Sequence, residues 1–327
     1  MERMNDLEDT ARTTATVHCS ILHIKLPLHD LPQPFFRAFE AAVSVGNTEL
    51  AVYSAAMHSA AQFNVGTNLG LIVNDMTALA DRLRQGQANA DALTLMSLPY
   101  WQASLNLSGS STHPMILNGE AMQEDKLIRE AQQTNNQVLL ELIGMVKIQL
   151  ACYFGYWDIA RGLWKEAQKE HTKLFKISFL HVILEFFSGM IYFETARRSG
   201  KRKYLKDARH VLKSMEKYSE VLGCPNTMPF LLILRAEEVS NASDLKTVMT
   251  AYNNAIAASS SVPHIAALAY ERAATVLHHQ GRWKCDVEIR YYVKMAINTY
   301  MGWGAVGKVE DIKRKFGMYL VVVGGGN

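Results

Sequence analysis

Histidines and their acidic neighbours are the residues of this chain that could carry chemistry, since imidazole binds metal ions and transfers protons near neutral pH. The sequence has 11 histidines. His181 and Glu185 are spaced to share one face of a helix, but no second ligand pair accompanies them. The adjacent His278 and His279 would point about 100° apart on a helix, which makes a poor chelate. We therefore expect packed or exposed histidines and no metal site.

Signatures of catalysis are missing from the sequence. It has no GxSxG nucleophile turn, no GxxxxGK[ST] phosphate loop, no kinase glycine-rich loop and no HRD or DFG motif. The cysteines Cys19, Cys152, Cys224 and Cys285 form no CxxC pair and suit reduced, packed thiols. Val321–Asn327 resembles the strand and glycine turn of a dinucleotide site, without the helix that such a site needs. We predict no catalytic residue, no cofactor and no enzymatic activity.

Aromatic side chains are a further candidate for ligand binding. They lie at helical spacing in two groups, Tyr291, Tyr292, Tyr300 and Trp303 in one and Trp157 and Trp164 in the other. Residues with this spacing usually face the core, where they bury a large apolar area. We interpret them as packing residues, and no residue for binding a partner can be named.

The charge of the chain is nearly balanced, with 34 basic and 31 acidic residues and a net charge of +3. This balance predicts no nucleic-acid partner. The densest basic stretch surrounds Gly200 and comprises Arg197, Arg198, Lys201, Arg202, Lys203 and Lys206. A phosphate-binding patch is one interpretation of this stretch, but its composition favours a solvated turn that leads into a helix.

Hydrophobic residues make up 49% of the chain and form no uninterrupted run of membrane-spanning length. The richest run, 175–192, is broken by Lys176, His181 and Glu185. The first residues include several acids, unlike the basic and then apolar start of a secretory signal. We therefore expect no membrane partner and a cytoplasmic protein.

Helices must position these side chains, because the apolar residues recur with a helical period along almost the whole chain. One helical face comprises Leu245, Val248, Met249, Tyr252, Ala255 and Ile256. Asn241 or Ser243 would cap this helix, and Pro263 suits the first turn of the next. A strand-like pattern occurs only at residues 318–323.

A recurring turn marks several helix pairs. Gly46–Ala51 and Gly155–Ala160 share the order glycine, two residues, acid, aliphatic residue and alanine. Asn241–Lys246 repeats the frame with asparagine and lysine at its ends, and Gly281–Asp286 is a weaker copy. Glycine suits the left-handed end of one helix, the acid suits the first turn of the next, and alanine permits close approach. The sequence therefore predicts an all-α fold, an irregular tetratricopeptide-like α-solenoid of antiparallel helix pairs.

The predicted helices divide into two arrays. They cover residues 8–26, 32–45, 48–63, 67–86, 90–106, 119–133, 136–153, 157–172, 176–198, 202–222, 227–239, 244–258, 264–279, 283–301 and 303–316. Residues 109–118 carry serine, threonine, proline and glycine and suit a linker. We predict an N-terminal helical sub-array at 1–108, a C-terminal tetratricopeptide-like array at 119–316 and a tail at 317–327.

The sequence also resembles known repeat regions. Ala160, Trp164 and Ala167 follow Gly155 at the spacing of the second helix of a tetratricopeptide repeat. The C-terminal third contains an ordered series, namely Tyr252-Asn-Asn-Ala255-Ile256, Ala266-Ala267-Leu268-Ala269-Tyr270-Glu271, Gly281, Tyr292-Val-Lys-Met-Ala296, Tyr300-Met-Gly-Trp303-Gly304-Ala305 and Lys308-Val309. This series resembles the end of the helical region in multi-sensor signal transduction multikinases. In one respect it departs from the pattern, because Asp286 stands where alanine is usual.

The resemblance implies a helical region that lies between a serine/threonine kinase with an AAA-type ATPase and a sensor with a histidine kinase. Neither catalytic domain is present in this sequence. Our first hypothesis is a non-catalytic scaffold in signal transduction, with a protein partner or adjacent kinase or ATPase domains. A second hypothesis is a ligand-sensing regulatory domain, and a third is a part of an ATP-dependent kinase whose catalytic domains lie outside this chain.

Overall fold

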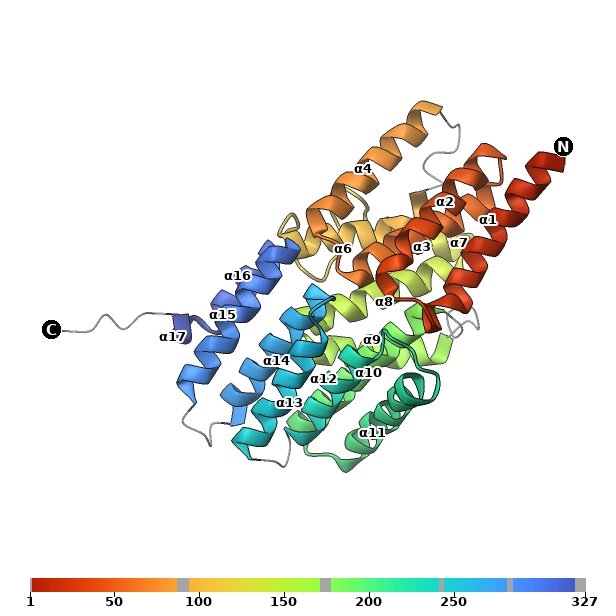
Figure 1. Cartoon of the computed structure of the whole chain (residues 1–327). Helices are drawn as coiled ribbons and strands as arrows, with labels where there is room; N and C mark the ends of the chain where they lie inside the picture. The colour runs from red at the N-terminus through yellow and green to blue at the C-terminus, as the bar shows by residue number, and fades with distance from the viewer. Residues whose placement is uncertain (1, 87–93, 171–177, 241–243, 281–284, 321–327) are drawn as a thin grey trace.

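A computed structural model of the chain describes residues 2–86, 94–170, 178–240, 244–280 and 285–320 (Figure 1). Every regular element in these ranges is helical, which confirms the predicted all-α class. The first helices are α1 (Glu2–Ser20), α2 (Pro32–Ser44), α3 (Thr48–Val65), α4 (Leu69–Gly86), α6 (Leu98–Ser108), α7 (Glu124–Gln133), α8 (Gln137–Phe154) and α9 (Trp157–Glu170). The others are α10 (Phe179–Ser199), α11 (Arg202–Glu216), α12 (Met228–Val239), α13 (Leu245–Ala258), α14 (Pro263–Gln280), α15 (Asp286–Trp303), α16 (Val306–Lys315) and α17 (Gly317–Leu320).

Three predicted elements differ from the observed ones. The sequence predicts a first helix to residue 26, but α1 ends at Ser20 and a 3-10 turn occupies Leu22–Ile24. A second 3-10 turn, Leu28–Asp30, lies between the predicted helices 8–26 and 32–45. Helix α7 begins at Glu124 rather than at residue 119, because the Asn118 side chain accepts the Glu124 amide and ends the preceding loop. Helix α6 starts at Leu98 rather than at residue 90, since the 3-10 turn Leu95–Ser97 precedes it, and residues 90–93 lie outside the described ranges.

The predicted strand pattern at 318–323 is wrong where it can be examined. Residues 318–320 belong to the short helix α17, and Tyr319 is buried by the last turns of the fold. Alternation over three residues is too short to override the helical packing of the neighbouring α15 and α16. The rest of this pattern, including the glycine-rich Val321–Asn327, lies outside the described residues.

The recurring turn of glycine, acid and alanine has the predicted structure at its first two copies, Gly46–Ala51 and Gly155–Ala160. Gly46 and Gly155 have the left-handed φ values of +76° and +73°. The acids Glu49 and Asp158 stand in the first turns of α3 and α9. The alanines that complete the frame, Ala51 and Ala160, are both fully buried.

The remaining copies of the frame fall mostly outside the described residues, at 241–243 and 281–284. One expectation about them is wrong, since the N-cap of α13 is neither Asn241 nor Ser243. Asp244 takes this place, and its carboxylate accepts the Thr247 amide at 3.0 Å. Pro263 begins α14 in the manner expected of a first-turn proline.

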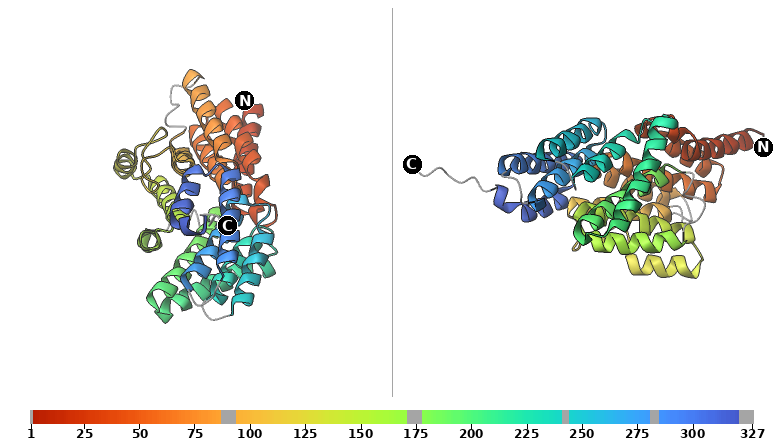
Figure 2. Two further views of the ribbon diagram at one scale, coloured as in Figure 1. Left: turned by 90° about the vertical axis from the view of Figure 1, so that its left-hand side faces the viewer. Right: turned by 90° about the horizontal axis from the view of Figure 1, so that it is seen from below.

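Helices that follow one another in the chain pack side by side (Figures 1 and 2). The closest neighbours are α14 with α15, α2 with α3, α10 with α11 and α12 with α13. Helices α1 and α17 lie at opposite ends of the molecule (Figure 1). A continuous core of buried side chains runs through all these helix contacts.

Several contacts join the first third of the chain to its last third. Trp303 Nε1 donates to the Thr67 carbonyl at 3.0 Å, and Asn68 Nδ2 donates to the Gly302 carbonyl at 3.0 Å. Helix α16 packs against α6, where Gly307 meets the backbone of Gly109. The described helices are therefore held together by distant contacts as well as by sequential ones.

The predicted linker at 109–118 is irregular but firmly attached to α6. Asn106 Nδ2 donates to the carbonyls of Pro114 and Ile116 at 3.1 and 2.9 Å. Met115 and Leu117 are buried in the core. The division of the chain at this segment stays a prediction.

Helices α8 and α10 are long and apolar enough to cross a membrane by length and composition. Their apolar windows are 67% and 78% buried inside the protein. Core helices of a soluble protein show this pattern, because neighbouring helices cover the apolar faces.

Candidate functional site

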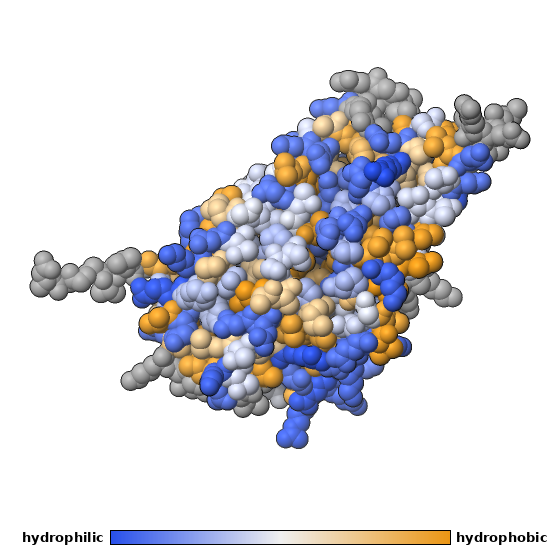
Figure 3. Space-filling model, viewed as in Figure 1, coloured by the Kyte–Doolittle hydropathy of each residue, from blue (hydrophilic) through white to orange (hydrophobic). Residues whose placement is uncertain are grey.

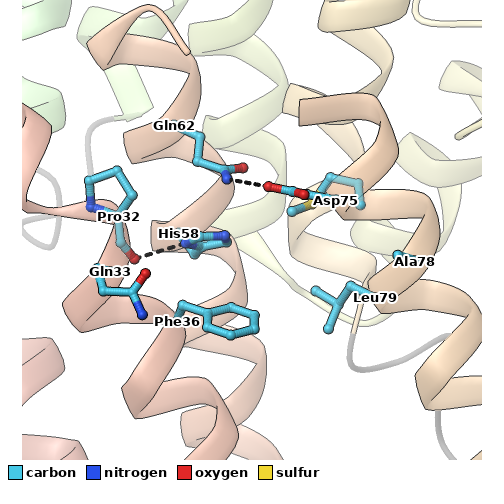
Figure 4. A pocket seen from close by; sticks show the side chains of 9 residues that line it. Pro32, Gln33, Phe36, His58, Gln62, Asp75, Ala78 and Leu79 are labelled. Carbon is cyan, nitrogen blue, oxygen red and sulfur yellow. Dashed lines mark hydrogen bonds between the residues drawn. The ribbon is translucent and has the colours of Figure 1, made fainter. Parts of the chain in front are cut away.

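A groove of about 390 Å³ lies between α2, α3 and α4 and is the strongest candidate for a binding site (Figure 4). Its lining residues are Pro32, Gln33, Phe36, His58, Gln62, Asp75, Met76, Ala78 and Leu79. Pockets of this size are typical of sites for small molecules or for single side chains of a partner.

Helix α3 supplies the floor of the groove. Every residue from Ser54 to Asn64 is buried, so this helix is covered on all sides by its neighbours. His58 and Gln62 stand one turn apart on the face toward the groove, and each is only 7% exposed. Burial of polar side chains is costly unless each has a partner. The buried polar residues of this helix also include Ser54, Ser59 and Asn64, but only His58 and Gln62 among them line the groove.

His58 presents a hydrogen-bond acceptor. Its Nδ1 lies 2.9 Å from the carbonyl of Pro32, so Nδ1 carries the proton of that hydrogen bond. Burial lowers the pKa of His58, outweighing the backbone hydrogen bond and the charge of Asp75. The neutral ring therefore keeps a lone pair on Nε2.

Gln62 and Asp75 add two more acceptors. Gln62 Nε2 donates to Asp75 Oδ2 at 2.9 Å, which fixes the orientation of the amide (Figure 4). Gln62 Oε1 is then buried without a hydrogen-bond partner among the described residues. Asp75 is exposed at the rim of α4 and supplies a negative charge. The polar side of the groove is thus rich in acceptors.

An apolar wall faces these groups. Phe36 packs against His58 with ring centroids 5.2 Å apart, and Leu79 stands on α4 on the other side of the groove (Figure 4). Met76 is buried beneath. Acceptors beside an apolar wall can bind a donor with an aliphatic or aromatic body.

The histidines singled out from the sequence lie elsewhere. His181 Nε2 lies 4.0 Å from Glu185 Oε2, and both residues stand on α10. His278 Nδ1 is hydrogen-bonded to the Tyr319 hydroxyl at 2.9 Å, and its ring stands 5.4 Å from that of His279. Within the described ranges, no three His, Cys, Asp or Glu residues are grouped so as to hold a metal ion.

The aromatic candidates are mainly buried. Tyr292, Tyr300 and Trp303 are at most 1% exposed and Trp157 is 7% exposed, so all four pack in the interior. Trp164 is half-buried and donates to the Tyr192 hydroxyl at 2.8 Å, whereas Tyr291 is 54% exposed. The structure brings none of these side chains to the α2–α3–α4 groove.

Arg197 of the basic stretch belongs to an ion cluster in the interior, whereas Arg198 and Lys201 are exposed. Arg197 turns inward and donates to Glu194 and, at 2.7 Å, to Glu237. Arg272 of α14 completes this cluster by hydrogen bonds of 2.7 Å to each of the same two carboxylates. Tyr252 donates to Glu237 at 2.9 Å. This buried cluster joins α10, α12, α13 and α14, and it was not foreseen because its members are far apart in the sequence.

A second buried ion cluster lies in α14 and α16. Lys308 is fully buried and donates to Glu271 at 2.6 Å and to Asp311 at 2.8 Å. Burial would lower the pKa of Lys308, but the two carboxylates outweigh it and raise that pKa. Tyr300 donates to Glu271 at 3.1 Å. In both clusters every buried charge faces at least one opposite charge, which is typical of structural ion pairs.

The sequence does hold a signal for the groove, although a weak one. Polar His58 and Gln62 recur one helical turn apart within a long buried helix, but an exposed helix face has the same spacing. Only the packing of α4 brings Asp75 to them. Comparison with protein-family models, with curated proteins and with solved structures finds no match to this chain. The groove is therefore interpreted from its own chemistry.

Proposed function

We propose that this chain is a non-catalytic binding module that holds a basic side chain of a protein partner in the α2–α3–α4 groove. The observation that carries the proposal is the convergence of three acceptors, on His58, Gln62 and Asp75, beside the apolar wall of Phe36 and Leu79.

The chemistry of the groove fits lysine or arginine. A cationic head group donates several hydrogen bonds, and the groove offers acceptors and one carboxylate. The aliphatic stem of the same side chain can lie along Phe36 and Leu79 while its charged end reaches Asp75 at the rim. Gln62 Oε1 is buried without a donor in the described part of the chain, and it would accept from the ligand once the amide turns toward the groove.

The fold that we propose for this role is an irregular tetratricopeptide-like stack of antiparallel helix pairs. Support comes from the two complete turn frames at Gly46 and Gly155 and from the packing of consecutive helices. Repeat arrays of this kind present extended surfaces for protein segments. The setting that we propose is cytoplasmic signal transduction, with a protein partner or adjacent kinase or ATPase domains, as the C-terminal resemblance implies.

A second candidate function is the sensing of a small amine. The groove volume of about 390 Å³ favours it, since pockets for small ligands commonly have about 300–1,000 Å³. The two candidates share the same ligand chemistry and differ in whether the amine belongs to a peptide.

Calorimetric titration with matched probes tests the proposal. One probe is a short acetylated and amidated peptide with a central lysine, and the others carry arginine or uncharged norleucine in its place. Phenethylamine represents the small ligand. We expect the lysine or arginine peptide to bind and the norleucine peptide to bind at least about tenfold more weakly, since one charge-assisted hydrogen bond has that worth.

Asp75→Asn removes the charge of the groove and should weaken binding of the basic peptide by about tenfold or more. Asp81→Asn is the matched control, because Asp81 is an exposed acid on the same helix that pairs with Arg84. Equal binding of the basic and norleucine peptides would show that the groove does not select a cation. Tighter binding of phenethylamine than of any peptide would favour amine sensing instead.

A further inference from the structure

A second cavity, of about 310 Å³, lies where α9, α10 and α11 meet. It is lined by Trp157, Asp158, Arg161, Thr195, Arg198, Ser199, Lys201 and Tyr204. It contains Arg198 and Lys201 of the basic stretch around Gly200, and none of its residues lines the α2–α3–α4 groove. Hydrophilic side chains gather at the lower edge of the molecule, over the start of α11 (Figure 3).

One carboxylate is shared between two guanidinium groups in this cavity. Asp158 Oδ1 lies 3.3 Å from Arg161, and Oδ2 lies 3.3 Å from Arg198. The Asp158 side chain is 78% exposed, so these long ion pairs are open to solvent. Exposed pairs of this kind contribute little and exchange partners readily. Lys201 lines the same cavity, which leaves an excess of positive charge.

The contacts and the pKa of Tyr204 are those of a side chain beside positive charges. The Lys203 ammonium stands 4.6 Å from the centre of the Tyr204 ring. Desolvation acts to raise the pKa of Tyr204, but the charges and hydrogen bonds of Lys203 and Arg161 outweigh it and lower that pKa. Arg161, Arg198 and Lys201 line the cavity and Lys203 lies beside Tyr204. These cations are accompanied by the exposed carboxylate of Asp158 and by Glu194, which lies 3.6 Å from Arg198.

The first turn of α11 carries basic residues where helices usually carry acidic ones. Acids are favoured there because the helix N-terminus carries a partial positive charge, yet this turn has none. Lys201 takes the N-cap position, with no hydrogen bond from its side chain to the helix. Arg202 and Lys203 follow directly. An anion at this place would offset both the side-chain charges and the helix dipole.

We propose that this cavity binds the phosphate group of a small phosphate compound. Arg161 and Arg198 can each donate two parallel hydrogen bonds to phosphate oxygens, and Lys201 can neutralise a further charge. A phosphate dianion has three terminal oxygens for cations that approach from three helices, whereas a carboxylate has only two oxygens. The bound phosphate would displace Asp158, the acid that Arg161 and Arg198 now share, while Arg198 Nε would keep its contact with Glu194 at 3.6 Å.

Titration of the whole chain with inorganic phosphate and with phenyl phosphate, at constant ionic strength, tests this site. We expect saturable binding in a single step and a rise in the melting temperature. Arg161→Gln should weaken binding by about tenfold or more, as the loss of a charge-assisted pair predicts. Lys165→Gln is the matched control, because it removes an exposed cation one turn further along α9.

Asp158→Asn gives the sharpest readout, since a structural role and a binding role predict opposite results. If Asp158 competes with phosphate for the arginines, its neutralisation should tighten phosphate binding by several fold. Weaker or unchanged binding in this variant would overturn the proposal, as would equal losses in Arg161→Gln and Lys165→Gln. Phenyl phosphate that binds more tightly than inorganic phosphate would identify a phosphate ester as the ligand, and the reverse order would identify free phosphate. Circular dichroism of each variant checks that the helices are retained.

Discussion

Arg272 and Glu237 form a doubly hydrogen-bonded ion pair in the interior, with Nε to Oε1 at 2.7 Å and a terminal guanidinium nitrogen to Oε2 at 3.0 Å. Their side chains are 3% and 0% exposed. The pair joins α14 to α12, and the second carboxylate on Arg272, from Glu194, extends the contact to α10. Charges buried in this way depend on one another, since each lacks water to replace its partner.

Arg272→Met should destabilise the fold strongly. The substitution keeps much of the apolar stem but leaves Glu194 and Glu237 with less compensating charge. We expect a loss of about 3–5 kcal/mol in the free energy of unfolding, measured by urea denaturation. The control is Arg209→Met, because Arg209 is 56% exposed in its pair with Glu238. That surface pair should cost less than about 1 kcal/mol, and similar losses in both variants would contradict a special role for the buried cluster.

The difference in the free energy of unfolding between the wild type and Glu237→Gln should become smaller at acidic pH. Desolvation acts to raise the pKa of Glu237, but Arg272 and Arg197 outweigh it and lower that pKa to about 2. A carboxyl whose pKa is lowered on folding stabilises the protein above its unfolded pKa and loses this contribution as pH falls through the folded pKa.

Urea denaturation of both proteins at a series of pH values measures the effect. The wild type should be more stable than Glu237→Gln at neutral pH. The difference should shrink between pH 4.5, the ordinary value of the group, and pH 2. A difference that is constant over this range would show that the carboxylate is not specifically stabilised in the folded chain.

Gly307→Ala should disturb the contact between α6 and α16. A Cβ at this position would lie 2.8 Å from the backbone of Gly109, which cannot move aside as a side chain can. We expect a loss of about 1–3 kcal/mol in the free energy of unfolding. Gly302→Ala is the control, because a Cβ there meets nothing within 4 Å and helical alanine is favoured over glycine. An unchanged stability of Gly307→Ala would show that the two helices can separate without cost.

The sequence by itself determined the helical class and most helix positions. These depend on local features, such as the period of apolar residues, the left-handed glycines at Gly46 and Gly155 and the proline at the start of α14. Each feature acts within one or two turns of chain, so it can be identified without knowledge of the fold. The exceptions, at the start of α7 and at α17, are places where a loop side chain or neighbouring helices set the local conformation.

Only the tertiary structure decided which polar groups meet. Arg272 contacts a glutamate 78 residues away, and Gln62 reaches Asp75 only because α4 packs beside α3. The basic stretch likewise divides into Arg197, whose side chain is only 15% exposed, and the exposed Lys201. The direction of each side chain follows from the helices that surround it. Spacing along one helix shows which residues share a face, but the packing of other helices determines whether that face is core, ion cluster or groove.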